Sequence, residues 1–130
     1  HLWDVMKIYN KIQTKFIQQQ NKLVARQFIG KDLIIYAQGI TVDSSNALIM
    51  HTKQNNIIYY VRESIIQQFS ETTKYALYRD DTITQAHAIT ENVRALTIQI
   101  LPLLGNRQFV KITLEFDYND IMEITCILPH

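Results

Sequence analysis

The chain has 130 residues and a mass of 15.3 kDa, a length that suits one domain. Hydrophobic residues make up 47% and charged residues 19% of the sequence, a balance that excludes an intrinsically disordered chain. Thirteen basic and twelve acidic residues give a formal net charge of +1, which excludes a general electrostatic attraction for nucleic acid or anionic membranes.

Residues 2 to about 29 are predicted to form one long amphipathic helix, because no glycine or proline interrupts them before Gly30. The apolar flank of this helix comprises Val5, Ile8, Tyr9, Ile12, Phe16, Ile17, Leu23 and Val24, widened near the start by Trp3 and Met6. A neighbouring basic flank comprises Lys7, Lys11, Lys15, Lys22 and Arg26. The helical phase shifts beyond Arg26. The run Leu33 to Tyr36 favours a last helical stretch, buried on most sides and extending to about residue 38 with a cap near Gly39; a short strand from residue 33 is the alternative.

The region from about residue 40 to 128 is predicted to be rich in β-structure, because the hydrophobic period there changes from 3.6 to 2. The strands we expect are 47–52 and 57–62 as a hairpin, then 75–79, 94–101, 110–118 and 121–128. Residues 63–74 are expected to form a loop or a short helical turn, and 102–108 a turn. The fold class is therefore α+β: a single domain, 1–130, with a long N-terminal amphipathic helix packed on a largely antiparallel sheet of four to six strands.

No set of residues in the sequence assembles an acid, a base and a nucleophile. The histidines His1, His51, His87 and His130 lack the spacing of metal ligands on a helix. Cys126 shares a face with apolar residues of the last strand, which favours an inert small hydrophobe. Because it is the single cysteine of the sequence, an internal disulfide and a multi-thiolate zinc site are excluded. Asp80-Asp81 is interpreted as turn chemistry. We therefore expect no enzymatic activity, no metal and no cofactor.

The basic flank allows three interpretations. Residues 1–38 carry six basic and two acidic side chains, and the rest of the chain compensates for this excess. The flank is either a solvated surface beside a buried one or a surface that faces a partner. Direct nucleic-acid binding is not expected, since no aromatic side chains that could stack on bases are interleaved with these lysines.

Three segments carry a resemblance to a known family. Residues 25–40, with Lys31-Asp32-Leu33-Ile34 and Gln38-Gly39-Ile40, resemble the helix end of type IV pilin-like proteins, specifically minor pilins of the PilW and pseudopilin J type. Residues 57–61, followed by Ala76-Leu77-Tyr78-Arg79, resemble their paired strands, and 89–98 resemble the segment before their late strands. The chain departs from the family in lacking the apolar signal helix with its cleavage site and early glutamate, and in having one cysteine instead of a loop disulfide.

The resemblance implies a structural, non-enzymatic subunit of a type IV pilus-like filament (a fimbrium), acting in filament assembly or a tip complex for adhesion, motility, competence-type DNA uptake or type II secretion. Its partners would be other minor pilins and the major pilin. The first residue is His1 instead of Met, so we expect a trimmed or processed form whose N-terminal membrane helix is missing. By the same resemblance, the protein would sit in the inner membrane with an extracytoplasmic (periplasmic) domain before assembly and in the extracellular pilus afterwards.

The surface expected to contact other subunits lies on the first part of the helix. Its apolar arc is wider than one sheet contact requires, and the lysines beside it would meet acidic patches of those subunits. The expected interface residues are Trp3, Val5, Met6, Lys7, Lys11, Lys15 and Ile17.

Two other classes of function remain open. One is a small α+β binding module that holds an apolar ligand between the helix and a curved sheet, with Tyr36, Tyr59 and Tyr60 lining the pocket. The other is a small enzyme in which His51 or His87 meets a carboxylate in a cleft. A helix that projects beyond the sheet with apolar side chains in water favours the pilin, and a closed pocket of several hundred Å³ favours the binding module.

Overall fold

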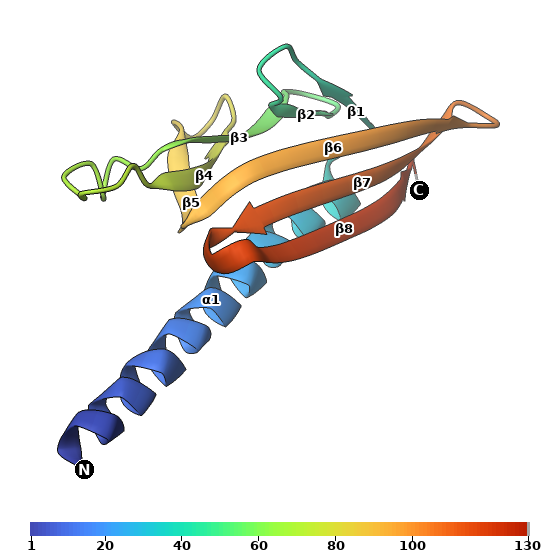
Figure 1. Cartoon of the computed structure of the whole chain (residues 1–130). Coiled ribbons are helices and arrows are strands. Elements are labelled where there is room, and N and C mark those ends of the chain that lie inside the picture. The colour runs from blue at the N-terminus through green and yellow to red at the C-terminus, as the bar shows by residue number, and fades with distance from the viewer. Residues whose placement is uncertain (130) are drawn as a thin grey trace.

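The computed structural model describes residues 1–129, which form a single long α-helix, a short 3₁₀ turn and eight β-strands (Figure 1). The helix is α1 (Leu2–Ile35), and the 3₁₀ turn is Asp117–Asn119. The strands are β1 (Gly39–Val42), β2 (Leu48–His51), β3 (Ile57–Glu63), β4 (Tyr75–Asp80), β5 (His87–Glu91), β6 (Val93–Leu103), β7 (Arg107–Phe116) and β8 (Asp120–Leu128). The fold is therefore α+β, with one N-terminal helix packed on antiparallel sheets.

The helix has two parts with different surroundings. Its C-terminal part packs against the sheets through Ala25, Ile29 and Leu33, which recur at four-residue spacing and are almost fully buried. Its N-terminal part projects away from the sheets, with the N-terminus at its far end (Figure 1). Residues 2–17 are all exposed and extend roughly 24 Å at the helical rise of 1.5 Å per residue. About the first half of the helix is therefore open to solvent within the described part of the chain.

The first five strands form one antiparallel sheet in the order β1-β2-β3-β4-β5. Its inner face contributes Leu48, Met50, Ile57, Tyr59 and Leu77 to the core. On the outer face, Tyr60 stacks on Tyr78 with ring centroids 5.6 Å apart. The outer face is partly covered as well, since Tyr78 is buried and its hydroxyl bonds the backbone of Glu63 and Ile65.

The last three strands form a second antiparallel sheet in the order β6-β7-β8. Asn92 is the single residue between β5 and β6 and adopts a left-handed φ of 63°, which asparagine tolerates better than most residues. The side-chain amide of Gln108 on β7 ties the two sheets together, because its Oε1 accepts from the Ile40 N–H at 3.0 Å and its Nε2 donates to the Ile40 carbonyl at 3.2 Å. Both sheets and the C-terminal part of α1 share one hydrophobic core.

Several expectations about the strands are confirmed. The hairpin of residues 47–62 corresponds to β2 and β3, and the loop at 63–74 lies between β3 and β4. The strands expected at 75–79, 94–101 and 121–128 correspond to β4, β6 and β8 with small changes at their ends.

The expectation of one sheet with four to six strands is wrong, since the described residues form eight strands in two sheets. The turn expected over 102–108 is shorter, because β6 and β7 continue to a Leu103–Arg107 pair and Gly105 and Asn106 close the hairpin with φ values of 75° and 58°. The strand expected over 110–118 ends at Phe116, since Tyr118 has a φ of 63° and lies in the turn before β8.

The expected end of the helix is also wrong. The helix ends at Ile35 instead of residue 38, and Gly39 begins β1 instead of capping the helix. Leu33 is buried but Ile34, Ile35 and Tyr36 are exposed, so this run is not buried on most sides; the alternative of a strand from residue 33 is wrong as well. An apolar run fits a helix that buries one face and leaves the others in water.

Candidate functional site

The projecting part of α1 displays a long row of apolar side chains to solvent. Trp3 is 62% exposed and Phe16 is 63% exposed. The other large apolar residues exposed in this part are Leu2, Val5, Met6, Ile8, Tyr9, Ile12, Ile17 and Leu23. Contiguous apolar surface of this kind marks an interaction site in a folded protein. We call these ten residues the apolar stripe.

The lysines next to the apolar stripe differ in whether they pair with a carboxylate. Lys7, Lys11 and Lys15 are exposed, and no carboxylate within residues 1–129 pairs with any of them. The Lys7 ammonium lies 5.3 Å from the centroid of the Trp3 ring, a cation–π contact. Lys22, in contrast, donates to Asp120 at the start of β8 at 3.2 Å. It therefore fixes the helix to the body, by which we mean the two sheets and the C-terminal part of α1 packed on them. Three free cations thus remain in a row at four-residue spacing.

The expected interface residues therefore lie on one projecting segment. Trp3, Val5, Met6 and Ile17 belong to the apolar stripe and Lys7, Lys11 and Lys15 to the free cations beside it. All seven are exposed. Their accessibility is compatible with a contact surface, although Ile17 lies at the edge of the sheets and lines a pocket with Phe116 and Tyr118.

A buried polar cluster anchors the C-terminal part of α1 to the five-stranded sheet. Asp32 of α1 is 3% exposed and accepts hydrogen bonds from the Tyr59 hydroxyl on β3 and from Arg79 on β4, whose Nε lies 2.8 Å from Oδ2. Arg79 Nη1 also donates to Asp81 Oδ2 at 2.7 Å. Every charge in this cluster has a partner of opposite sign, which is the condition for burying charges without a large penalty.

Three members of this cluster, Tyr59, Arg79 and Asp81, have shifted pKa values. Burial, together with the hydrogen bond to Asp32, raises the pKa of the Tyr59 hydroxyl above its ordinary value, so Tyr59 is neutral. The hydrogen bond to Asp32 raises the pKa of the Arg79 guanidinium. Hydrogen bonds from the Thr84 backbone and other donors of the 81–84 turn lower the pKa of Asp81 to about 2. At neutral pH Tyr59 is therefore neutral, and Arg79 and Asp81 carry their charges.

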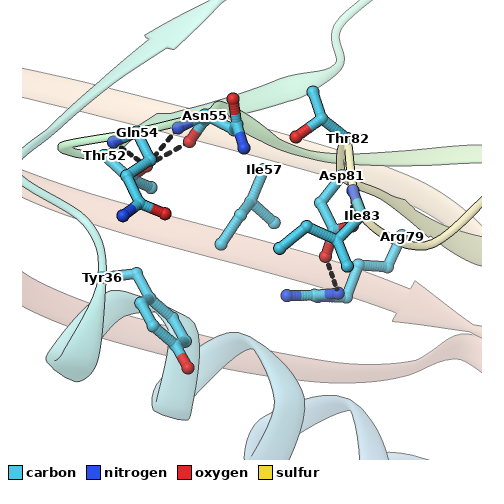
Figure 2. Close-up of a pocket in the computed structure, with 9 residues that line it drawn as sticks. All are labelled: Tyr36, Thr52, Gln54, Asn55, Ile57, Arg79, Asp81, Thr82 and Ile83. Carbon is cyan, nitrogen blue, oxygen red and sulfur yellow. Dashed lines mark hydrogen bonds and ion pairs between the residues drawn. The ribbon is translucent and has the colours of Figure 1, made fainter.

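A solvent-open cavity of about 160 Å³ lies beside this cluster, where α1 ends (Figure 2). Most of its lining residues are polar, although much of the surface that they present is apolar, and we call it the polar cavity. Tyr36 lines it from the helix side, Gln54 and Asn55 from the β2–β3 loop, and Arg79 and Asp81 from the end of β4. Gln54 and Asn55 had no distinguishing signal in the sequence, because a Lys-Gln-Asn-Asn run is typical of any exposed turn. In the sequence, Asp32 and Arg79 stand out only as parts of the segments that resemble the pilin-like family.

The tyrosines of the expected apolar binding module do not share one pocket. Tyr59 is fully buried in the core. Tyr60 follows it on β3 and points to the opposite face, where it stacks on Tyr78. Tyr36 alone of the three lines the polar cavity. The space between the helix and the sheets is filled by side chains such as Ile29 and Leu33.

The histidines and the cysteine have ordinary surroundings. His51 Nε2 lies 2.8 Å from the Thr41 hydroxyl oxygen, and His87 Nδ1 lies 3.1 Å from the Gln85 carbonyl oxygen, while His130 lies outside the described residues. Burial raises the pKa of the Cys126 thiol, which lowers its reactivity at neutral pH. Over residues 1–129, no three His, Cys, Asp or Glu side chains gather as a metal site.

No helix in the described part of the chain is both long enough and apolar enough to cross a membrane. We compared the chain with models of known protein families, with curated proteins and with solved structures, and none of the three comparisons gave a match.

Proposed function

We propose that this chain is the extracytoplasmic part of a minor pilin or pseudopilin, a structural subunit that joins other subunits of a type IV pilus-like filament through its projecting helix. The observation that carries the proposal is the apolar stripe on the part of α1 that leaves the body. The proposal also rests on the resemblance of residues 25–40, 57–61, 76–79 and 89–98 to that family.

The hydrophobic effect supports a packed partner for the helix. Burying one large apolar side chain contributes about 1.5–3 kcal/mol relative to leaving it in water. The apolar stripe holds ten such side chains on a helix of only 34 residues. A partner helix laid along it would cover a row of contacts at the i, i+3 and i+4 spacing by which helices recognise each other.

The charges beside the apolar stripe favour a partner other than a second copy. Lys7, Lys11 and Lys15 are unpaired, and Asp4 is the sole acidic side chain among residues 2–24. Two copies of this segment side by side would bring lysines near lysines, which is unfavourable. We therefore infer a different subunit with an acidic flank, in line with the minor and major pilins that the resemblance implies.

The proposed setting follows from the same family resemblance. The subunit would be held in the inner membrane by a helix preceding His1 and would pass into the extracellular pilus on assembly. There it would act in filament priming or at the tip, and so in adhesion, motility, DNA uptake or secretion.

The test is assembly in cells that depend on this protein. Replacing Lys7, Lys11 and Lys15 by Glu should reduce the number of filaments strongly while leaving the thermal unfolding of the purified domain unchanged, since all three side chains are exposed. The matched control replaces Lys31, Arg94 and Arg107 by Glu, which makes the same change in charge on exposed positions of the body and should leave assembly intact. Normal filaments with the helix variant would overturn the proposal.

A further inference from the structure

The polar cavity at the end of α1 carries an inference that goes beyond subunit assembly. It lies at the opposite end of α1 from the N-terminus, so a ligand there would leave the apolar stripe free (Figure 1). Its volume of about 160 Å³ is below the roughly 300–1,000 Å³ of sites that enclose drug-sized ligands. The cavity therefore has room for a single small ring.

The two loops that form the cavity are held in place by their own hydrogen bonds. In the β2–β3 loop, the Thr52 hydroxyl accepts from the N–H groups of Gln54 and Asn55 at 3.2 and 3.0 Å and donates to the Asn55 carbonyl. In the β4–β5 loop, Asp81 Oδ1 accepts from the N–H groups of Ile83 and Thr84 at 2.9 and 2.6 Å. Because these loops are ordered before binding, they lose less conformational entropy when a ligand binds.

The charged groups of the cavity are paired with one another. Arg79 donates to Asp32 and Asp81, and Asp81 also accepts from the Thr84 hydroxyl at 2.9 Å. An anionic ligand would meet the Asp81 carboxylate, and the guanidinium has carboxylates on its Nε, Nη1 and Nη2 atoms. The cavity therefore suits a neutral ligand.

The groups that remain open are neutral hydrogen-bonding groups beside apolar surface. The side chains of Gln54, Asn55 and Thr82 line the cavity, and none of them has a hydrogen bond within residues 1–129 (Figure 2). Amides and a hydroxyl can each donate and accept, which matches a ligand with several hydroxyl groups. Tyr36 and Ile83, both exposed, add apolar surface of the kind that packs on the C–H face of a sugar ring.

We propose that this cavity binds one neutral sugar ring, with the Gln54 and Asn55 amides and the Thr82 hydroxyl bonding its hydroxyl groups and Tyr36 packing on its apolar face. A single ring has few atoms, so the dissociation constant is expected in the millimolar range. The inference does not depend on the proposed function, because none of the cavity residues belongs to the apolar stripe.

The test is a titration of the ¹⁵N-labelled chain followed by amide chemical shifts. The probes are the methyl α-glycosides of glucose, galactose, mannose and N-acetylglucosamine, each added to roughly 50 mM, well above a millimolar dissociation constant. At least one probe should give saturable shifts centred on residues 36, 52–57 and 79–83. Failure of all four probes to do so, or saturable shifts confined to another region, would overturn the proposal.

Variants that keep the size of the side chains but remove their amides test whether the cavity binds the sugar through hydrogen bonds. Gln54→Met with Asn55→Leu keeps the size of both side chains and removes their amides, and we expect at least tenfold weaker binding of the probe that binds. Gln99→Met with Asn10→Leu makes the same changes at exposed positions away from the cavity and should bind normally. Unchanged binding by the first variant would contradict the proposal, as would inorganic phosphate shifting the cavity residues more than any sugar.

Discussion

Asp32 on α1 and Arg79 on β4 form a buried ion pair in which Nε lies 2.8 Å from Oδ2 and Nη2 lies 3.3 Å from Oδ1. The pair joins two residues that are 47 positions apart in the chain. Because Tyr59 donates to the same carboxylate, one side chain of the helix is held by two neighbouring strands. This arrangement fixes the direction in which the rest of α1 leaves the body.

Asp32→Ala is expected to destabilise the domain by about 3–5 kcal/mol, because it leaves Arg79 and the Tyr59 hydroxyl without their buried acceptor. Urea unfolding followed by circular dichroism measures the change. Asp4→Ala, at an exposed helical position, is the control and should change stability by less than about 0.5 kcal/mol. A loss below about 1 kcal/mol for Asp32→Ala would mean that the cluster does not anchor the helix.

Ile29→Ala and Ile12→Ala should change the stability of the domain by different amounts, because the two residues lie in different parts of the helix. Ile29 is fully buried in the core, so its truncation should cost about 2–5 kcal/mol. Ile12 is 62% exposed on the apolar stripe, and its truncation should cost less than about 0.5 kcal/mol in the isolated domain. Equal losses of stability in chemical denaturation would show that residues 2–24 pack on the body in solution.

Gly30→Ala should stabilise the domain by about 0.5–1 kcal/mol, because alanine loses less backbone freedom than glycine when the helix forms. Gly30 lies inside α1, and an added Cβ would meet nothing within 4 Å. Thermal unfolding measures the effect as a higher melting temperature. A lower melting temperature would show that this turn of the helix is not a regular helical turn.

The ionisation of Asp81 should make stability depend on pH in the acidic range. Its pKa is lowered from 3.8 to about 2 in the folded chain, so its contribution is present above 3.8 and lost as the pH falls through about 2. Asp81→Asn should therefore lose less stability than the unchanged chain between about pH 5 and about pH 2, measured by urea unfolding at both values. Identical losses of stability in the two proteins would contradict a lowered pKa of Asp81.

The regular part of the fold could be predicted from the sequence because it follows periodicity. The alternation of Val110, Ile112 and Leu114 with polar residues indicates a strand with one buried face, and all three residues are buried on β7. The division into two sheets could not be predicted in this way. The chain passes from β5 to β6 through the single left-handed residue Asn92, which leaves no periodic signal in the sequence.

The candidate sites could be predicted from the sequence to different degrees. The prediction of the seven interface residues rests on helical spacing together with the family resemblance, and the structure leaves all seven exposed. The pairing of Asp32 with Arg79 could not be predicted, because helical and strand periods define faces but not which distant side chains meet. The polar cavity likewise forms only when loops 52–56 and 81–86 come together beside Tyr36.

The most direct measurement of the central claim is photo-crosslinking from the apolar stripe in cells that assemble the filament. Phe16 is replaced by p-benzoylphenylalanine, an aromatic residue that reacts with neighbouring side chains on illumination, and Thr97, exposed on β6, is replaced in the same way as the control. We predict a covalent adduct with another pilin-like subunit from position 16 and none from position 97. Absence of a subunit adduct from position 16 would contradict the assignment of this helix as the subunit contact.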